Sequence, residues 1–510
     1  MESLATESLI LCEIRRQRWG ASCTPTRGLS STRRLCHDRP MSTTDSADHL
    51  RYAHGAVAAR AAYRDAGREA RQRAKRSKHA HYEPREGRDP LGIIERQNAD
   101  RLQDLVPLRM ARMAESPFAF FRGTAALQAA DLADSLDSGF FVVACGDAHI
   151  SNFGVFAAPD RSLVFDLNDF DEASLAPWEW DLKRLATSVV IGGQSNGFAD
   201  AVVHEATVRA VATYRRSIRR MTDLSPVERF YLRDLGNPAG GKHASSRVAM
   251  RRVVKDAAKR TSERVASKIM DRDTAGAPFI REQPPTLTHV STEIEARLGG
   301  IVDDYLRTAA PDVAMLMSQY TATDVVRRVV GVGSVGTRCF IVVFAGSHGD
   351  VVILQVKEAG RSVLDEFGGL RDHPDRPSGT RIDELAGGSR VVTLQRILQS
   401  TSDLFLGHVT VDGRGYYVRQ FRDLNAAFDV AELDQPAFFD YVEACATKLA
   451  RAHSQSPRAG FIAGYVGRSK RFDEAIAQWS LAYAAQSRAD YEAFRAAIEA
   501  GRFPVAESAR

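Results

Sequence analysis

The chain has little cysteine. Six cysteines occur in 510 residues, with no Cys-x-x-Cys pair and no regular spacing. Cys145, Cys339 and Cys445 stand in apolar or helical surroundings, where a buried thiol is the usual outcome. This pattern argues against a disulfide framework and predicts a reducing, cytoplasmic location.

Long apolar runs and a strong net charge are also missing. No stretch of about 18 apolar residues occurs, so we expect no transmembrane helix and no membrane partner. The net charge of +5 is small for this length, which argues against a dedicated nucleic-acid binder. A hydrophobic content of 44% and a charged content of 26% are ordinary for a soluble globular protein.

The N-terminal residues 1–40 lack apolar periodicity and are rich in Arg, Ser and Thr. Their apolar stretch, Leu9 to Cys12, is too short for a secretory signal, although an Arg-rich and acid-poor leader is compatible with a transit peptide. Met41 and the residues after it resemble a natural protein start. We therefore expect residues 1–40 to be a disordered or non-native extension.

The stretch from Phe140 to Asp181 carries the strongest chemical signal. An apolar run typical of a buried strand leads into Gly146-Asp147-Ala148-His149, and Asn152 follows. A second apolar run leads into acids that include Asp166 and Asp169. A phosphoryl-transfer site needs a carboxylate for the attacking hydroxyl, together with an amide oxygen and a carboxylate for Mg²⁺. We predict Asp147 as the base, and Asn152 with Asp169 or Asp166 as metal ligands.

Three segments of this stretch resemble known kinase motifs. GDAHISN (146–152) resembles the H-G-D-x-H-x-x-N catalytic loop of aminoglycoside phosphotransferases and choline kinases, and DFDEA (169–173) resembles their metal segment. Asp181 resembles the helix-start carboxylate that supports the catalytic loop from behind in that group. Cys145 replaces the usual His, and the longer gap before Asp169 leaves Asp166 as a rival metal ligand.

The block as a whole resembles more closely the bacterial family called domain of unknown function 2252. This resemblance covers roughly Leu91 to Asp490 and includes SPFAFFRG before the loop and DLKRLATS after it. It implies no established substrate.

Further along the chain, Asp324 to Val356 predicts an antiparallel meander with a glycine turn, Gly331-Val-Gly333-Ser334-Val-Gly336. In a dinucleotide-binding unit such glycines open an amphipathic helix, whereas here an apolar β-rich run follows. Strand, glycine turn and strand are typical of the phosphate-covering loop of kinases. Lys357 ends the next strand and is predicted to contact nucleotide phosphates. Tyr416 to Phe421 is a candidate for the strand that leads into the adenine hinge.

The order of these motifs predicts the architecture. The catalytic loop precedes the glycine turn, which is the reverse of an ordinary kinase, so we expect an α+β, two-lobed, protein-kinase-like fold that is circularly permuted. The prediction requires Lys357 to lie within about 10 Å of Asp147 and Asp169, because these groups share one triphosphate. The expected parts are the extension (1–40), a basic helical segment (41–90), a helical lobe with the catalytic and metal-binding loops (91–320), a β-rich nucleotide lobe (321–430) and C-terminal helices packing on the helical lobe (431–510).

The leading function hypothesis is an ATP- and Mg²⁺-dependent phosphotransferase acting on a small hydroxylated molecule. His149 is expected either to orient the loop or to be a structural histidine. The alternatives are nucleotidyl transfer to a protein hydroxyl, as in the kinase-like selenoprotein O family, a non-catalytic pseudokinase, and a metal-dependent hydrolase built on the Asp and His cluster. The complete set of predicted groups argues against a pseudokinase, and the lack of paired His ligands argues against a hydrolase.

Some assignments stay open at this level. Glu358, Glu366 and Glu384 are all possible partners of Lys357. A further set of basic residues just upstream of the loop is expected at the surface, although one of them could face a phosphate: Arg109, Arg112 and Arg122.

Overall fold

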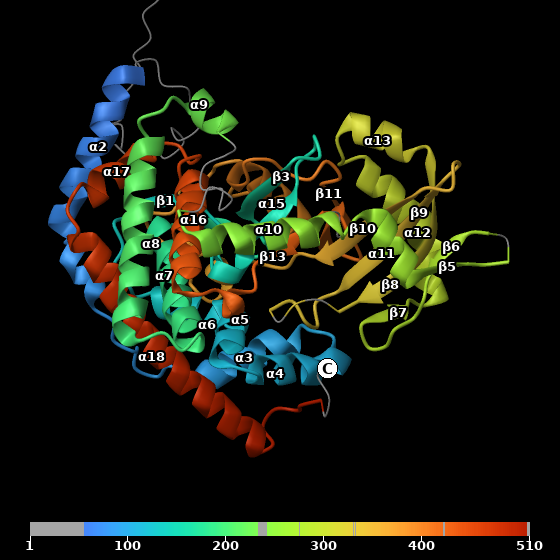
Figure 1. Cartoon of the computed structure of the whole chain (residues 1–510), viewed down its shortest axis with the longest axis horizontal. Coiled ribbons are helices and arrows are strands. Elements are labelled where there is room, and N and C mark those ends of the chain that lie inside the picture. Colours follow the sequence, from blue (N-terminus) through green and yellow to red (C-terminus); the bar gives the residue numbers. More distant parts are fainter. Residues whose placement is uncertain are drawn as a thin grey trace, which may run out of the picture. The chain divides into compact units, whose positions relative to one another are not determined.

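The computed structural model describes residues 56–232, 242–274, 276–329, 331, 333–421 and 424–506. The predicted N-terminal extension and the proposed start at Met41 lie outside these residues. Helices and several antiparallel sheets make up the described chain, so the predicted α+β class is confirmed. None of the described helices combines the length and apolar character needed to cross a membrane. Element labels are those of Figure 1.

The first helices begin where a proline or a cap residue allows them to begin. Residues 90–114 contain two helices, and Pro107 lies in the first turn of the second, where its missing N–H is tolerated. Ser116 begins the next helix, because its Oγ accepts a hydrogen bond from Ala119 N at 3.1 Å. These elements are α2 (Ala56–Arg73), η2 (Arg76–Ala80), α3 (Pro90–Ala99), η3 (Gln103–Leu105), α4 (Val106–Ala114), α5 (Pro117–Gly123) and α6 (Ala125–Leu132).

Two small antiparallel sheets frame the predicted catalytic loop. In one sheet Ala144 pairs with Ser174, and in the other Phe153 pairs with Leu167. Loops 145–152 and 168–173 therefore leave the sheets at matching ends and lie together. The strands are β1 (Phe141–Ala144) with β4 (Ser174–Pro177), and β2 (Phe153–Ala157) between β3 (Leu163–Leu167) and β13 (Ala426–Ala427); the turn η4 (Ile150–Asn152) precedes β2.

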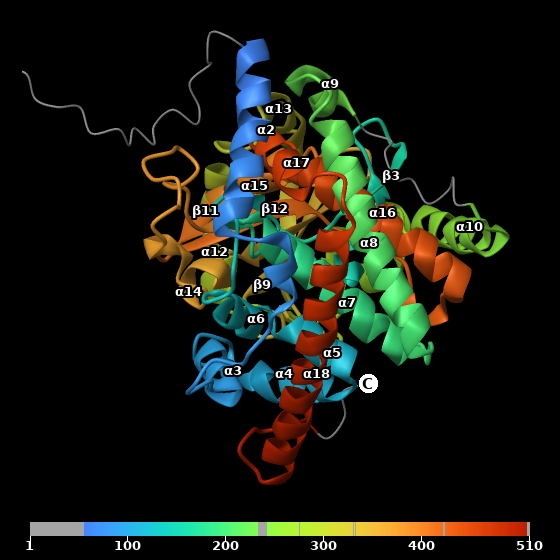
Figure 2. The ribbon, with the colours of Figure 1, turned by 90° about the vertical axis from the view of Figure 1, so that its left-hand side faces the viewer.

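Long helices pack around these strands in one large apolar core. Trp178 is fully buried at the start of α7 and stacks on Tyr214 of α8, with ring centroids 5.8 Å apart. The longest helix, α18, runs beside α7 and α8 (Figure 2). The C-terminal helices thus pack on the helices that follow the catalytic loop. The members are α7 (Trp178–Ser195), α8 (Asp200–Met221), α16 (Gln435–His453), α17 (Gly460–Val466) and α18 (Arg471–Glu499).

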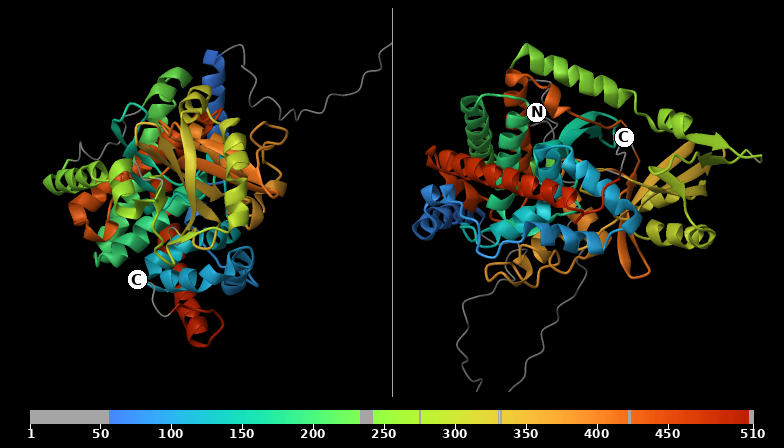
Figure 3. Two further views of the ribbon diagram at one scale, coloured as in Figure 1. Left: turned by 90° about the vertical axis from the view of Figure 1, so that its right-hand side faces the viewer. Right: turned by 90° about the horizontal axis from the view of Figure 1, so that it is seen from below.

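A six-stranded antiparallel sheet, in the order β11-β12-β10-β9-β8-β7, forms the other major part (Figures 1 and 3). Alternate residues face opposite sides: Val342 and Phe344 pack toward α12 and α13, while Ile341 and Val343 pack against α11 and β6. The predicted meander is confirmed. The sheet elements are β7 (Leu287–His289), α12 (Thr292–Leu306), α13 (Pro311–Met317), β8 (Tyr320–Arg328), β9 (Cys339–Gly346), β10 (Val351–Glu358), β11 (Gly407–Val411) and β12 (Arg414–Gln420).

The β-rich part of the chain begins before the expected boundary at residue 321. β7 is already a strand of the sheet, and α12 and α13 pack against it. The sequence missed β7 because three residues are too few for a visible alternation. The remaining elements are α9 (Pro226–Tyr231), α10 (Ala244–Ala258), α11 (Ser262–Ile269), β5 (Met270–Arg272), β6 (Pro278–Ile280), α14 (Val363–Glu366), η6 (Leu370–Asp372), α15 (Gly387–Leu398) and η7 (Val430–Glu432).

A buried ion-pair cluster ties the early helices to α18. The Arg88 guanidinium donates to Asp131 Oδ1 at 2.6 Å and to Asp490 Oδ2 at 2.6 Å. The three side chains are at most 9% exposed. Removing one partner from such a cluster leaves buried charges without compensation.

We predict that Arg88→Met lowers the free energy of unfolding by about 3–5 kcal/mol, because two buried carboxylates lose their cation. Urea unfolding followed by circular dichroism measures the change. Arg502→Met is the matched control, since Arg502 also pairs with a carboxylate, Glu95, but both side chains are about half exposed. That control should lose about 0–1 kcal/mol. Equal losses in the two variants would contradict the prediction.

Candidate functional site

The predicted catalytic loop is held from behind by a buried carboxylate. Asp181, in the first turn of α7, accepts hydrogen bonds from Cys145 N at 2.6 Å and Gly146 N at 2.8 Å. His453 of α16 also bonds Asp181, with Nε2 3.1 Å from Oδ2. Gly146 has a φ of +84°, and a Cβ there would lie 2.1 Å from the Glu172 carbonyl oxygen, so only glycine fits. This is the supporting contact that the motif resemblance implied for Asp181.

Cys145 occupies the position where the related motif has His. It is fully buried, and its thiol donates to the Asp169 carbonyl oxygen at 3.4 Å. Cys145 therefore links loop 145–152 to loop 168–173.

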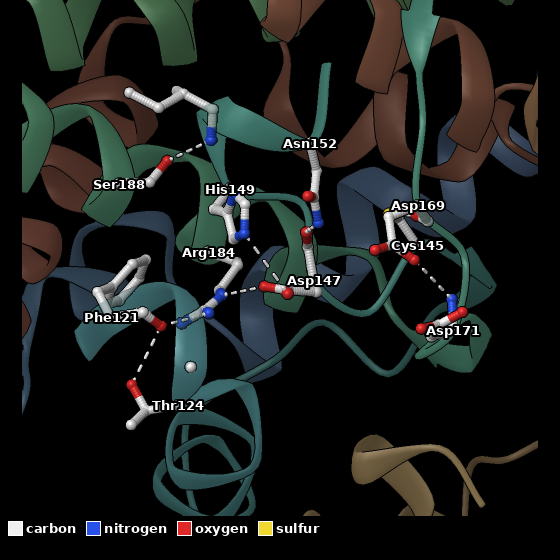
Figure 4. Close-up of polar contacts among 12 residues, drawn as sticks. Phe121, Thr124, Cys145, Asp147, His149, Asn152, Asp169, Asp171, Arg184 and Ser188 are labelled. Atoms are coloured by element: carbon white, nitrogen blue, oxygen red, sulfur yellow. Dashed lines mark hydrogen bonds and ion pairs between the residues drawn. The ribbon is translucent and has the colours of Figure 1, made fainter. Parts of the chain in front are cut away.

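Asp147 points toward a cationic side chain of α7 (Figure 4). Arg184 Nε donates to Asp147 Oδ1 at 2.8 Å, and the same guanidinium donates to Gln128 Oε1 at 2.9 Å and to the Phe121 carbonyl oxygen at 2.7 Å. Burial alone would raise the pKa of Asp147, but Arg184, His149 and Arg122 together lower it below its usual value. Asp147 is therefore an ionised carboxylate at neutral pH.

His149 lies beside this carboxylate, with Nε2 3.6 Å from Asp147 Oδ2. Burial lowers the pKa of His149 to about 3, although Asp147 opposes the shift. The imidazole is thus neutral at pH 7, and its buried Nδ1 has no hydrogen-bond partner among the described residues. The next residue, Ile150, donates its N–H to Ser188 Oγ at 2.9 Å, which fixes the loop.

Asn152 and Asp169 lie on the side of Asp147 away from Arg184 (Figure 4). The Asn152 amide nitrogen donates to the Asp147 carbonyl oxygen at 2.7 Å, which leaves the amide oxygen for another partner. The Asp169 side chain is 37% exposed. Burial first, and then the neighbouring Asp171, raises the pKa of Asp169.

Lys357 meets the same acidic segment from the sheet. Its ammonium contacts Asp171 and lies 3.9 Å from Asp169 Oδ2, and its side chain is only 4% exposed. Burial opposes the charge, yet Asp169 and Asp171 raise the pKa of Lys357 well above its usual value. Tyr417 also donates to Asp171, at 2.8 Å. The acidic partner of Lys357 is therefore Asp171, and Glu358 instead pairs with arginines.

These side chains surround a cavity of about 110 Å³. Its lining contains seven of the predicted site residues: Asp147, His149, Asn152, Asp169, Gly331, Gly333 and Ser334. Gly336 and Lys357 are not among the residues that line the cavity, although Lys357 contacts Asp171, which is. Asp166 is apart from the cavity: it is fully buried on β3 and accepts hydrogen bonds from Ser400 N and Oγ at 2.8 and 2.7 Å.

The glycine turn is held by the segment that follows α3. Leu102 N donates to the Gly336 carbonyl oxygen at 2.8 Å, and Arg101 donates to the Val335 carbonyl oxygen. Arg112 of α4 donates to the Gly331 carbonyl oxygen at 2.6 Å. Figure 1 shows α3 to α5 beneath the β8–β9 turn, and in the view from below they lie between α18 and the sheet (Figure 3).

Several cavity residues were missed at the level of sequence. Arg101 and Glu172 line the cavity, and Arg184 balances Asp147. Of the three arginines upstream of the loop, Arg122 lines the cavity, whereas Arg109 is buried and donates to Asn98 at 2.6 Å. The sequence carried no clear signal for Arg184, because Glu179, Asp181 and Lys183 in the same two turns of α7 are also charged.

The side-chain oxygen atoms of Asp169 and Asn152 fit a metal ion that is held mainly by a bound substrate. Among the described residues, no group of three or more His, Cys, Asp or Glu side chains is arranged to hold a metal ion. Mg²⁺ is commonly bound by one or two carboxylates together with substrate phosphates and water. The Asp169 carboxylate and the Asn152 amide oxygen satisfy that smaller requirement.

A second cavity of about 500 Å³ lies at the start of loop 168–173. Asn168, next to Asp169, lines it together with Gln355 of β10. The end of the predicted hinge strand contributes Arg419, Gln420 and Phe421.

A family model described as an uncharacterized protein conserved in bacteria, domain of unknown function 2252, matches residues 101–497. No curated protein and no solved structure matches the chain.

Glu172 gives the cavity a measurable pH dependence. Its Oε2 accepts a hydrogen bond from Val363 N at 2.7 Å, and burial raises its pKa to about 7. The raised pKa means that the folded protein keeps this proton at pH values where the unfolded chain has released it. Stability supplied by the protonated group is therefore lost as pH rises between about 4.5 and about 7.

We predict that Glu172→Gln is stabilised relative to the wild type by about 3 kcal/mol above pH 7, and that the two proteins converge near pH 4. Glutamine keeps an acceptor for Val363 N and cannot ionise. Urea unfolding at a series of pH values checks the difference. A difference that does not change between pH 4 and pH 8 would rule out the raised pKa.

Proposed function

The chain belongs to the family called domain of unknown function 2252, and we propose that it is an ATP- and Mg²⁺-dependent phosphotransferase that acts on a small hydroxylated molecule. The observation that carries this proposal is the convergence on one cavity of Asp147, Asn152, Asp169 and the glycine turn, with Lys357 bonded to the acids at its edge. These groups come from distant parts of the chain, and phosphoryl transfer requires all of them in one place.

Asp147 is assigned to the acceptor hydroxyl. Its carboxylate stays ionised at neutral pH, and its contact with Arg184 fixes its direction. A low pKa makes it a weak base, so its main contribution is to orient the hydroxyl before transfer and to accept the proton as the new P–O bond forms.

Asn152 and Asp169 are assigned to the metal ion, which would neutralise charge on the transferring and leaving phosphates. Asp169 has the more open carboxylate of the two rival ligands, because Asp166 is committed to Ser400. The amide oxygen of Asn152 remains available after its nitrogen has bonded the Asp147 carbonyl oxygen.

The glycine turn and Lys357 are assigned to the nucleotide phosphates. The turn joins β8 and β9, and Lys357 lies on β10, the next strand; kinases place their glycine loop and lysine in this same order. Lys357 Nζ lies 3.9 Å from Asp169 Oδ2, which for this pair is inside the limit of about 10 Å that one shared triphosphate sets. We propose on this basis a kinase-like arrangement that is circularly permuted, since loop 146–152 precedes turn 331–336.

The nucleoside is assigned to the second cavity. A cavity of about 500 Å³ is within the usual range for small-molecule sites, whereas about 110 Å³ leaves room only for phosphates and a hydroxyl. The end of β12 lines this cavity, as expected for a strand that leads into an adenine hinge.

We predict that the protein transfers label from γ-labelled ATP, and not from α-labelled ATP, to a component of a metabolite extract in the presence of Mg²⁺. Asp147→Asn should lower the transfer rate by about 10²–10⁴-fold while Mg·ATP binding survives, because the metal ligands are elsewhere. Thin-layer chromatography of the products and calorimetry of Mg·ATP binding check both parts.

Transfer of label from α-labelled ATP would instead mean nucleotidyl transfer. A wild-type protein that binds Mg·ATP but transfers neither label would be a pseudokinase. Loss of nucleotide binding in Asp147→Asn would make Asp147 a metal ligand and contradict its assignment.

We predict that Asp169→Asn weakens Mg·ATP binding by about tenfold or more, because a divalent ion loses one of its few protein carboxylates. Calorimetry with and without Mg²⁺ measures the loss. Asp166→Asn is the comparison, since the amide oxygen can still accept the Ser400 hydrogen bonds and the cavity is untouched. The ligand assignment is wrong if a folded Asp166→Asn binds Mg·ATP more weakly than Asp169→Asn does.

A further inference from the structure

One cation at the candidate site, Arg122, lacks a side-chain partner among the described residues. Arg122 forms no side-chain hydrogen bond or ion pair with another described residue, and its buried Nε is unsatisfied. The other cations near the cavity are engaged. Arg184 donates to three acceptors, and Lys357 contacts Asp171. Arg101 donates to a carbonyl oxygen of the glycine turn, although its buried Nε also lacks a partner among the described residues.

The position of Arg122 is fixed by a short, well-packed helix. It lies at the end of α5, whose Phe120 and Phe121 are buried. The carbonyl oxygen of Arg122 lies 3.4 Å from where a Cβ of Gly333 would be, so its backbone abuts the glycine turn. Its side chain lines the same cavity as Asp147 and Asp169. Arg122 therefore stands between the glycine turn and the catalytic loop.

The electrostatic setting of Arg122 favours an anion in the cavity. Burial lowers the pKa of Arg122, and the carboxylates of Asp147 and Asp169 act in the opposite direction. A largely buried guanidinium without a hydrogen-bond partner is costly unless a ligand supplies acceptors. His149, the other basic side chain of the loop, is neutral at pH 7 and cannot supply positive charge.

We propose that Arg122 is a further catalytic residue of the proposed transfer, which binds the non-bridging oxygens of the γ-phosphate while that group moves to the acceptor. This inference rests on the proposed function. In the transfer, the acceptor oxygen forms a bond to phosphorus, the bond between the γ-phosphorus and the bridging oxygen breaks, and its electron pair leaves with ADP. The acceptor proton passes to Asp147, and Arg122 exchanges no atoms.

The chemistry of the guanidinium suits this task. Its planar array of N–H donors matches two phosphate oxygens at once and stays charged at any physiological pH. Arginines that contact the transferring phosphoryl group in other enzymes contribute about 10³–10⁵-fold to the rate. Lysine keeps the charge but lacks the two-point geometry, so Arg122→Lys should be intermediate.

The test compares the ground state with a mimic of the transferring group. For Arg122→Gln we expect Mg·ATP affinity to change less than about threefold, affinity for Mg·ADP with aluminium fluoride to fall by about 10²-fold or more, and turnover of γ-labelled ATP to fall by about 10³-fold. Calorimetry and label release measure these quantities without knowledge of the acceptor. Arg96→Gln, an exposed arginine on the neighbouring helix α3, is the control and should match the wild type.

The outcomes separate this inference from the proposed function. If the wild type binds no Mg·ATP, both fail. Suppose that the wild type binds Mg·ATP and turns it over, and that Arg122→Gln has the same affinity for Mg·ADP with aluminium fluoride and the same turnover. In that case only the role of Arg122 is overturned. If Arg122→Gln fails to fold, Arg122→Lys is measured instead. A wild-type affinity for Mg·ADP with aluminium fluoride and a wild-type turnover in Arg122→Lys would also overturn the role of Arg122.

Discussion

The carboxylate of Asp181 is the contact on which the candidate site depends. It is buried at the start of α7 and accepts the N–H groups of Cys145 and Gly146, so the backbone that enters the catalytic loop has a fixed direction. His453 joins the same carboxylate from α16, which ties the C-terminal helices to the loop. Asp147 follows Gly146 directly, and the left-handed turn of that glycine presents the Asp147 side chain to the cavity.

Charge balance explains how the cavity holds several carboxylates together. Asp147 is matched by Arg184, and Asp171 by Lys357. Asp169 and Glu172 instead have raised pKa values, for which burial is the main cause. Arg122 is the opposite case, a cation for which no described residue supplies a side-chain hydrogen bond or ion pair. This combination of acidic groups and a guanidinium supports the proposed ligand, Mg·ATP, which carries both a divalent cation and phosphate oxygens.

The sequence predicted local features well and distant contacts poorly. The β1 strand and the meander were predictable because their apolar runs are bounded by glycine and polar turns. The burial of Asp166 was not predictable, since it depends on contact between β3 and Ser400, more than two hundred residues away in the chain. The contacts of Arg101 and Arg112 with the glycine turn were equally hidden, because they join segments whose approach is set by tertiary packing. The kinase-like, permuted architecture remains a proposal.

A crystal structure of the protein with Mn²⁺ and a non-hydrolysable ATP analogue would show whether this cavity holds Mg·ATP, since the anomalous signal of manganese locates the metal ion. We expect a manganese peak bonded to the Asp169 carboxylate and the Asn152 amide oxygen, with phosphates beside Lys357 and the Gly331–Gly336 turn. A nucleotide bound away from this cavity, or a manganese peak at Asp166, would contradict this expectation.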